Sequence, residues 1–229
     1  MTHSSSNTTV QAQLAKAIPQ WSRQLGREIG GLRGFLTRHR QRIAPFDAIL
    51  GVLETEKKYD VLDIGGGEGL LLWLFARSGH LNKGLCVDAN PKNIAVGIKA
   101  FSRLAESAIK LSCTSSIEGW PAEQFDIVTM IDVMHHVPPA LHRDFMVEAC
   151  ARVKEGGMLI YKDMADEPFI FATANRLHDL VLARDWITYA PIEDICSIAG
   201  ECGLMLKEAR DTRTLWYAHE MRVFERPPM

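Results

Sequence analysis

The stretch Val61-Leu62-Asp63-Ile64-Gly65-Gly66-Gly67-Glu68-Gly69 is an apolar segment that runs into four glycines, and a second apolar segment, 70–75, follows it. Glycine is needed where the backbone turns with positive φ or where a ligand must approach it closely. A strand, a glycine-rich loop and a helix in this order predict the first unit of a parallel α/β sheet, with a ligand above the strand end. Taken alone, the same loop could also be a tight connection.

An acidic residue, Asp88, ends the next predicted strand 19 residues after Gly69. This is close to the offset of roughly 20 residues at which a carboxylate receives the ribose hydroxyls of a bound nucleotide. An adenosine-containing ligand is therefore favoured. The NAD fingerprint G-x-G-x-x-G fails because Leu70 or Glu68 stands where a glycine is required, and a P-loop fails because no G-K-[ST] follows the glycines.

From residue 58 onward, short apolar runs alternate with helical segments that end in glycine. This alternation is typical of successive βα units and predicts a doubly wound α/β fold with a mostly parallel sheet. Two later apolar runs, 204–209 and 215–224, are separated by polar residues and predict an antiparallel C-terminal hairpin. The expected parallel strands are 61–64, 85–87, 109–113, 125–131 and 158–161.

The chain before the first strand has a different pattern. Residues 1–9 are small and polar and predict a disordered tail. Residues 10–57 carry apolar side chains at helical spacing, interrupted by Pro19 and the Gly30-Gly31 pair, which predicts a helical extension that acts as a lid. Residues 58–229 then form the ligand-binding domain, with a helical insertion at about 165–190.

Charge and cysteine content narrow the classes of partner. The 26 basic and 28 acidic residues give a formal charge of −2, so no overall positive field attracts nucleic acid. Six arginines lie between Arg23 and Arg42 against the single acid Glu28, and this run is either a solvated helix face or a lid that faces an anion.

The five cysteines include no C-x-x-C pair, which argues against a disulfide framework and a zinc knuckle. With no signal peptide and no long apolar segment, we expect a cytoplasmic protein without a membrane anchor.

The pattern acid-x-Gly-x-Gly-x-Gly, followed by Asp88-Ala89-Asn90, resembles the class I S-adenosylmethionine-dependent methyltransferase family. The resemblance covers roughly residues 58–161 and includes the strand 125–132, the segment 134–138 and the Gly156-Gly157 turn. It implies a Rossmann-like sheet of seven strands that binds S-adenosyl-L-methionine and releases S-adenosyl-L-homocysteine. A small-molecule member of the family is favoured, because no Asn-Pro-Pro-Tyr follows the fourth strand and no basic stripe crosses the domain.

The resemblance also implies roles for individual residues. Gly65, Gly66 and Gly67 would pass under the amino-acid part of the cofactor, and Asp63 would fix that loop and the cofactor ammonium. Asp88 would take the ribose hydroxyls. Where the family usually places an acid after the third strand, this chain has 114–118, so the adenine contact passes to Ser116 and Ile117. The implied cofactor contacts are Asp63, Gly65, Gly66, Gly67, Gly69, Asp88, Ala89, Asn90, Ser116, Ile117 and Ile131.

Because a sulfonium methyl is already activated, the protein has to exclude water, orient the acceptor and, where needed, remove a proton. The candidates for proton removal follow the fourth and fifth strands, and they are His135, His136 and Asp163. Structural roles remain open alternatives: the histidines can cap a turn or line the cofactor pocket, and Asp163 can cap the next segment. No H-x-x-H or E-x-x-H cluster is present in the ordered part of the chain, so we expect no metal.

The sequence therefore predicts a methyltransferase that acts on an oxygen or nitrogen of a small molecule, as a monomer or homodimer without nucleic-acid or membrane partners. One alternative is a nucleic-acid or protein methyltransferase that uses the arginine run 23–42. Another is a non-methylating enzyme or a regulatory protein of the same fold.

Overall fold

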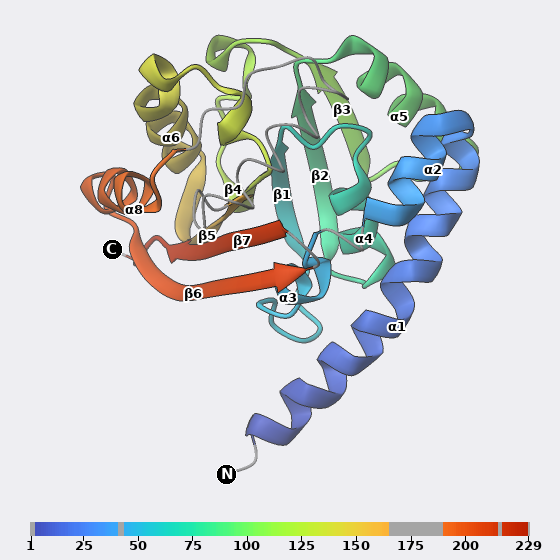
Figure 1. Ribbon diagram of the computed structural model, residues 1–229, viewed down its shortest axis with the longest axis horizontal. Coiled ribbons are helices and arrows are strands. Elements are labelled where there is room, and N and C mark those ends of the chain that lie inside the picture. Colours follow the sequence, from blue (N-terminus) through green and yellow to red (C-terminus); the bar gives the residue numbers. More distant parts are fainter. Residues whose placement is uncertain (1–2, 41–43, 165–189, 215–216, 229) are drawn as a thin grey trace. The chain divides into compact units, whose positions relative to one another are not determined.

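The computed structural model describes residues 3–40, 44–164, 190–214 and 217–228 (Figure 1). The chain forms two compact units, Met1–Ser115 and Ser116–Met229, each of which is described by itself. The predicted domain boundary at residue 57 stays a prediction. The predicted helical insertion at 165–190 lies outside the described residues, except for residue 190.

The first unit begins with helices α1 (His3–Ile29), α2 (Gly31–His39) and α3 (Phe46–Leu50). Helix α1 starts at His3, whereas the sequence predicted a disordered tail over 1–9, because the segment 3–9 holds neither proline nor glycine to stop a helix. The helix also continues through Pro19. The break falls at the glycine pair, where Gly30 and Gly31 have φ values of +72° and +56°.

Three parallel strands form the sheet of the first unit in the order β3-β2-β1. They are β1 (Tyr59–Ile64), β2 (Leu81–Asp88) and β3 (Ile109–Cys113), connected through α4 (Leu70–Arg77) and α5 (Pro91–Arg103). Helix α4 is buried over its first six residues, and α1 packs against both α4 and α5 (Figure 1). Helix α5 begins directly after Asn90, whose side chain caps it by accepting a hydrogen bond of 3.0 Å from the backbone N–H of Lys92.

The second unit contains four strands in the order β4-β5-β7-β6. Strands β4 (Phe125–Ile131) and β5 (Val153–Met164) are parallel, and β7 (Tyr217–Glu225) is antiparallel to both β5 and β6 (Met205–Thr214). Among the described residues of this unit, the helices are α6 (His142–Ala151) and α8 (Ile192–Glu201), and three short 3-10 turns are η2 (Ile117–Gly119), η3 (Met134–His136) and η4 (Pro139–Leu141).

The predicted fold class is confirmed: the seven strands form a mixed, mostly parallel sheet of the Rossmann-like type that ends in an antiparallel hairpin. Strand β6 is longer than predicted and includes the polar residues 210–214 that we expected in a turn. Pairing with β7 continues to the register pair Thr214 and Tyr217, so the ladder extends through this polar sequence.

Candidate functional site

The glycine loop after β1 is left-handed at alternate positions. Gly65, Gly67 and Gly69 have φ values of +69°, +62° and +83°, a conformation in which other residues are strained. Gly66 is required for a different reason, since a Cβ there would stand 2.1 Å from Oδ2 of Asp63 and 2.9 Å from Sγ of Cys86. The loop therefore lies directly on a buried acid and a buried thiol.

Asp63 supports the loop from below. Its side chain is buried at the carboxyl end of β1, opposite Cys86 in the register of the two strands. Burial, together with the negative charges of Asp63 and Asp88, holds the pKa of the Cys86 thiol well above its ordinary value. The thiol is therefore neutral and serves as packing under the loop.

Asp88 supports the loop from the side. Its Oδ2 accepts a hydrogen bond of 2.9 Å from the backbone N–H of Gly67, and its Oδ1 accepts one of 2.8 Å from the backbone N–H of Asn90. A carboxylate oxygen has lone pairs for more than one donor, and Asp88 is half-buried, so hydroxyl groups of a ligand can still be received. Ala89 and Asn90 beside it are exposed.

These residues fit an adenosine ligand that carries an amino-acid part. A Cβ on Gly67 would meet its nearest atom, Nδ2 of Asn93, only at 3.9 Å, so the outer side of the loop is open for close approach. An acid that can bind ribose hydroxyls lies beside this open face. The arrangement brings Asp63, Gly66, Gly67 and Asp88 together as the sequence predicted.

One residue at this loop was missed by the sequence interpretation. The guanidinium of Arg33, on α2, lies 3.5 Å from Oε1 of Glu68 and also donates to Oδ1 of Asn93. The arginine run 23–42 signalled a cationic segment, but nothing in its spacing distinguished Arg33 from its neighbours.

Three further predicted cofactor contacts belong to the second unit. Ser116 is exposed at the start of η2, Ile117 is half-buried in that turn, and Ile131 is buried at the end of β4. Their part in cofactor binding stays a prediction.

Of the predicted proton acceptors in the second unit, two are in direct contact. Nδ1 of His135 lies 2.5 Å from Oδ1 of Asp163, and the backbone N–H of His135 donates to Oδ2 over 3.2 Å. Both side chains are buried, at 5% and 6% exposure. Because a carboxylate can only accept, Nδ1 carries the hydrogen, and Nε2 is the ring nitrogen that can take a proton.

His136 differs from its neighbour. It is exposed, and its ring lies 4.1 Å from that of His135 at an interplanar angle of 50°. The sequence did not distinguish the two histidines. In the structure, the ring of His135 contacts the buried carboxylate of Asp163.

The second unit also contains a buried ion pair that the sequence did not predict. Nζ of Lys162, on β5, lies 2.5 Å from Oδ1 of Asp132, which directly follows β4. Lys162 is fully buried, and Asp132 has a φ of +58°, an unusual conformation for a residue with a Cβ. Such backbone strain occurs preferentially at functional sites.

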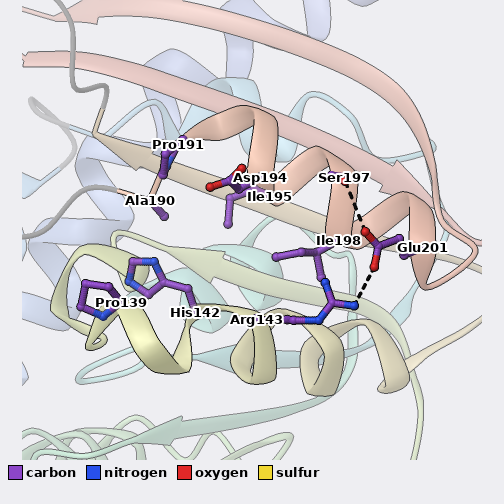
Figure 2. A pocket seen from close by; sticks show the side chains of 10 residues that line it. All are labelled: Pro139, His142, Arg143, Ala190, Pro191, Asp194, Ile195, Ser197, Ile198 and Glu201. Carbon is purple, nitrogen blue, oxygen red and sulfur yellow. Dashed lines mark hydrogen bonds and ion pairs between the residues drawn. The ribbon is translucent and has the colours of Figure 1, made fainter.

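A groove of about 370 Å³ lies between α6 and α8 (Figure 2). Its apolar side is formed by Ile195 and Ile198, and an ion pair of 2.6 Å between Arg143 and Glu201 crosses from α6 to α8. His142, also on α6, forms a hydrogen bond of 2.8 Å through Nε2 to the carbonyl of Val137. The groove is therefore lined by both charged and apolar side chains, and it lies at the start of α6, the helix that follows His135 and His136 in the chain.

No group of three or more His, Cys, Asp or Glu side chains in the described ranges is arranged to hold a metal ion. Within the same ranges, no helix is both long and apolar enough to cross a membrane.

Comparison with known proteins gives concordant results. The sequence model of a family described as a methyltransferase domain matches residues 32–209. The ubiquinone biosynthesis O-methyltransferase of Nitrosospira multiformis is 31% identical over 160 residues, which cover 65% of this chain and 64% of that protein. That of Paramagnetospirillum magneticum is 34% identical over 117 residues, or 51% of this chain and 41% of that protein. The chain thus spans less than two thirds of the length of these relatives.

Among solved structures, magnesium protoporphyrin IX methyltransferase from Synechocystis, with bound S-adenosylhomocysteine, has a TM-score of 0.67 at 18% identity. The match covers 89% of this chain and 93% of that one. At this identity the likeness shows the fold.

Proposed function

This chain belongs to the methyltransferase domain family of class I S-adenosylmethionine-dependent enzymes, and from that membership we propose that it methylates an oxygen or nitrogen of a small-molecule acceptor. The observation that carries the proposal is the glycine loop braced by two acids. Gly66 leaves no room for a Cβ above Asp63, and Gly67 donates to Asp88, so this stretch is built as a ligand cradle.

In the proposed enzyme, Gly65, Gly66 and Gly67 would lie under the amino-acid part of the cofactor, and Asp88 would receive the ribose hydroxyls. When bound, S-adenosylmethionine supplies a methyl group activated by a sulfonium. Asp63, which is buried directly beneath Gly66, keeps the loop in place. The remaining predicted contacts are Gly69, Ala89, Asn90, Ser116, Ile117 and Ile131.

His135 is the proposed general base. Its Nε2 would take the proton of the acceptor hydroxyl or amine as the acceptor forms a bond to the methyl carbon and the bond between that carbon and the cofactor sulfur breaks, which leaves S-adenosylhomocysteine. Asp163 is the positioning residue, since its contacts to Nδ1 and to the backbone N–H of His135 fix the ring and stabilise the imidazolium that results. The exposed ring of His136 has no part in this step.

For the acceptor, we favour an oxygen atom of a small molecule over a nitrogen atom. The relatives named ubiquinone biosynthesis O-methyltransferases transfer to oxygen, and the net charge of −2 gives no general attraction for nucleic acid. We further propose that the protein works in the cytoplasm as a monomer or homodimer, without membrane or nucleic-acid partners and without a metal.

Calorimetry with S-adenosylmethionine and S-adenosylhomocysteine tests the first step. We expect the wild type to bind both, and Asp88→Ala to lose about 1–3 kcal/mol of binding free energy through loss of charge-assisted hydrogen bonds. The matched control is Asp60→Ala. Asp60 lies near the start of β1, at the end of the strand away from the glycine loop, so this variant should bind both compounds as the wild type does. If neither compound binds the wild type, the proposal is wrong.

Mass spectrometry of phenolic, amine, RNA and protein acceptors, each incubated with the cofactor, tests the second step. A mass gain of one CH₂ on a small phenol or amine supports the proposal. Methylation of RNA or protein alone would favour the macromolecular alternative, and a changed acceptor without the CH₂ gain would favour non-methylating chemistry on the same fold.

A further inference from the structure

Arg33 connects helix α2 to the acid of the cofactor cradle. Its guanidinium donates to Oδ1 of Asn93, near the start of α5, and lies 3.5 Å from Oε1 of Glu68 in the glycine loop. Nδ2 of Asn93 in turn lies 3.5 Å from Oδ1 of Asp88. A chain of polar contacts therefore runs from the helical extension to the carboxylate that braces Gly67.

The helix that carries Arg33 is held in a defined position. Gly34 of α2 approaches α1 so closely that a Cβ there would stand 2.1 Å from the carbonyl oxygen of Gly26. Thr37 is buried beside it and donates over 2.9 Å to the carbonyl of Arg33. Helix α1 is fastened in turn, because Nε1 of Trp73 donates over 3.0 Å to the carbonyl of Trp21. The Arg33 backbone is thus fixed relative to the loop.

The charge that Arg33 supplies matches the surroundings of the loop. Asp63, Glu68 and Asp88 all lie at or under it, and the negative charge of each contributes to raising the pKa of the nearby Cys86 thiol. Repulsion among three carboxylates opposes their close placement, and a guanidinium beside Glu68 reduces it. Arg23 and Arg27 of the same run are exposed on α1, so they offer controls of equal charge.

We propose that Arg33 is a positioning residue of the cofactor cradle, which orients Asp88 through Asn93 and screens Glu68, so that the docking of α2 sets cofactor affinity. This inference rests on the proposed function and assigns the helical extension a part in it. The arginine run then has two roles: Arg33 serves the cradle, while exposed members such as Arg23 and Arg27 form a solvated surface.

The test is calorimetry with S-adenosylhomocysteine on the full chain. We expect Arg33→Gln to raise Kd about tenfold, as for the loss of one charge-assisted contact, and Arg27→Gln to stay within about twofold of the wild type. Asn93→Ala should raise Kd by the same factor as Arg33→Gln. Because the two residues act in series, the double variant should lose about tenfold rather than about a hundredfold.

Hydrogen exchange of residues 31–40 gives a second readout. The cofactor product should slow exchange there in the wild type and in Arg27→Gln, and have little effect in Arg33→Gln. Melting of the unliganded proteins shows whether each variant is folded, and Arg33→Lys, which keeps the charge without the planar fork, should recover part of the affinity.

Several results would overturn the inference. One is wild-type affinity in Arg33→Gln, and another is equal weakening by Arg33→Gln and Arg27→Gln, which would indicate a general charge effect. Multiplying losses in the double variant would show that Asn93 does not relay the contact. Absence of binding in every protein, the wild type included, would instead overturn the proposed function, and this inference with it.

Discussion

Nδ1 of His135 and Oδ1 of Asp163 lie 2.5 Å apart, and the same carboxylate also accepts the backbone N–H of His135. One acid therefore fixes both the ring and the backbone of the histidine. The two residues lie 28 positions apart in sequence, His135 in the turn η3 that follows β4 and Asp163 near the end of β5. An imidazole held in this way presents a defined nitrogen for proton transfer.

The first prediction concerns Asp163→Asn. An amide at this position can donate to Nδ1 and so stabilise the wrong tautomer, which should lower kcat by about 10²–10⁴-fold while the affinity for S-adenosylhomocysteine stays unchanged. Steady-state kinetics with the acceptor found by mass spectrometry, together with calorimetry, measure both quantities. The matched control is His136→Gln, which changes the exposed ring and should keep kcat within about twofold. Normal turnover by Asp163→Asn and His135→Gln would place proton removal elsewhere.

The second prediction concerns the glycine loop. In Gly66→Ala the new methyl group would stand 2.1 Å from Oδ2 of Asp63, so the loop has to shift. We expect a loss of about 1–3 kcal/mol in the free energy of unfolding and at least a tenfold weaker binding of S-adenosylhomocysteine. Denaturant unfolding and calorimetry measure the two effects.

Gly200→Ala is the control for this substitution. A Cβ at Gly200, in α8, would meet nothing within 4 Å, so alanine there should stabilise the protein by about 0.5–1 kcal/mol and leave cofactor binding unchanged. Equal behaviour of the two alanine variants would show that the contact at Gly66 is not decisive.

Local sequence patterns were sufficient to predict the cradle. Neighbouring residues encode each of its parts: the apolar strand, the glycines that follow it and the helix cap at Asn90. Asp88 lies at the expected offset from the last glycine of the loop, Gly69. The hairpin β6–β7 was predicted for the same reason. The apolar spacing predicted a helix in the region of α1, but it did not predict that the helix continues through Pro19, where the burial of Leu14 and Ile18 supports it.

Contacts between strands could not be predicted in the same way. The contact of His135 with Asp163 and that of Lys162 with Asp132 depend on the register of β4 and β5, in which Ile131 lies opposite Lys162. The positive φ of Asp132 was equally hidden, since such backbone is expected mainly at glycine and only occasionally at aspartate. The sequence offered His135, His136 and Asp163 as candidates. Only the structure shows that His135 and Asp163 are the two in direct contact.

The third prediction concerns the cysteines. Burial is the main cause that raises the pKa of Cys150, to about 12, and Cys86 is also raised well above its ordinary value. At pH 8 only about one Cys150 in 10⁴ is then a thiolate, which is the reactive form. Cys113, in contrast, is exposed. Iodoacetamide at pH 8 should therefore label Cys113 first and reach Cys86 and Cys150 only after denaturation, as peptide mass spectrometry can follow. Early labelling of Cys86 in the native protein would contradict its place under the loop.

The fourth prediction concerns the buried pair of Lys162 and Asp132. In Asp132→Ala the ammonium of Lys162 is left buried without this carboxylate, and we expect a loss of about 3–5 kcal/mol in the free energy of unfolding. Adding Lys162→Met removes the buried charge at similar volume, so the double variant should recover most of the loss. Urea unfolding of the wild type, both single variants and the double variant completes the cycle. Additive losses in the free energy of unfolding would show that the two side chains do not depend on each other.

The same double variant can also be tested for activity. If it is stable and binds S-adenosylhomocysteine normally but turns over slowly, then the ion pair serves the reaction rather than the stability of the fold, as the strained backbone at Asp132 indicates.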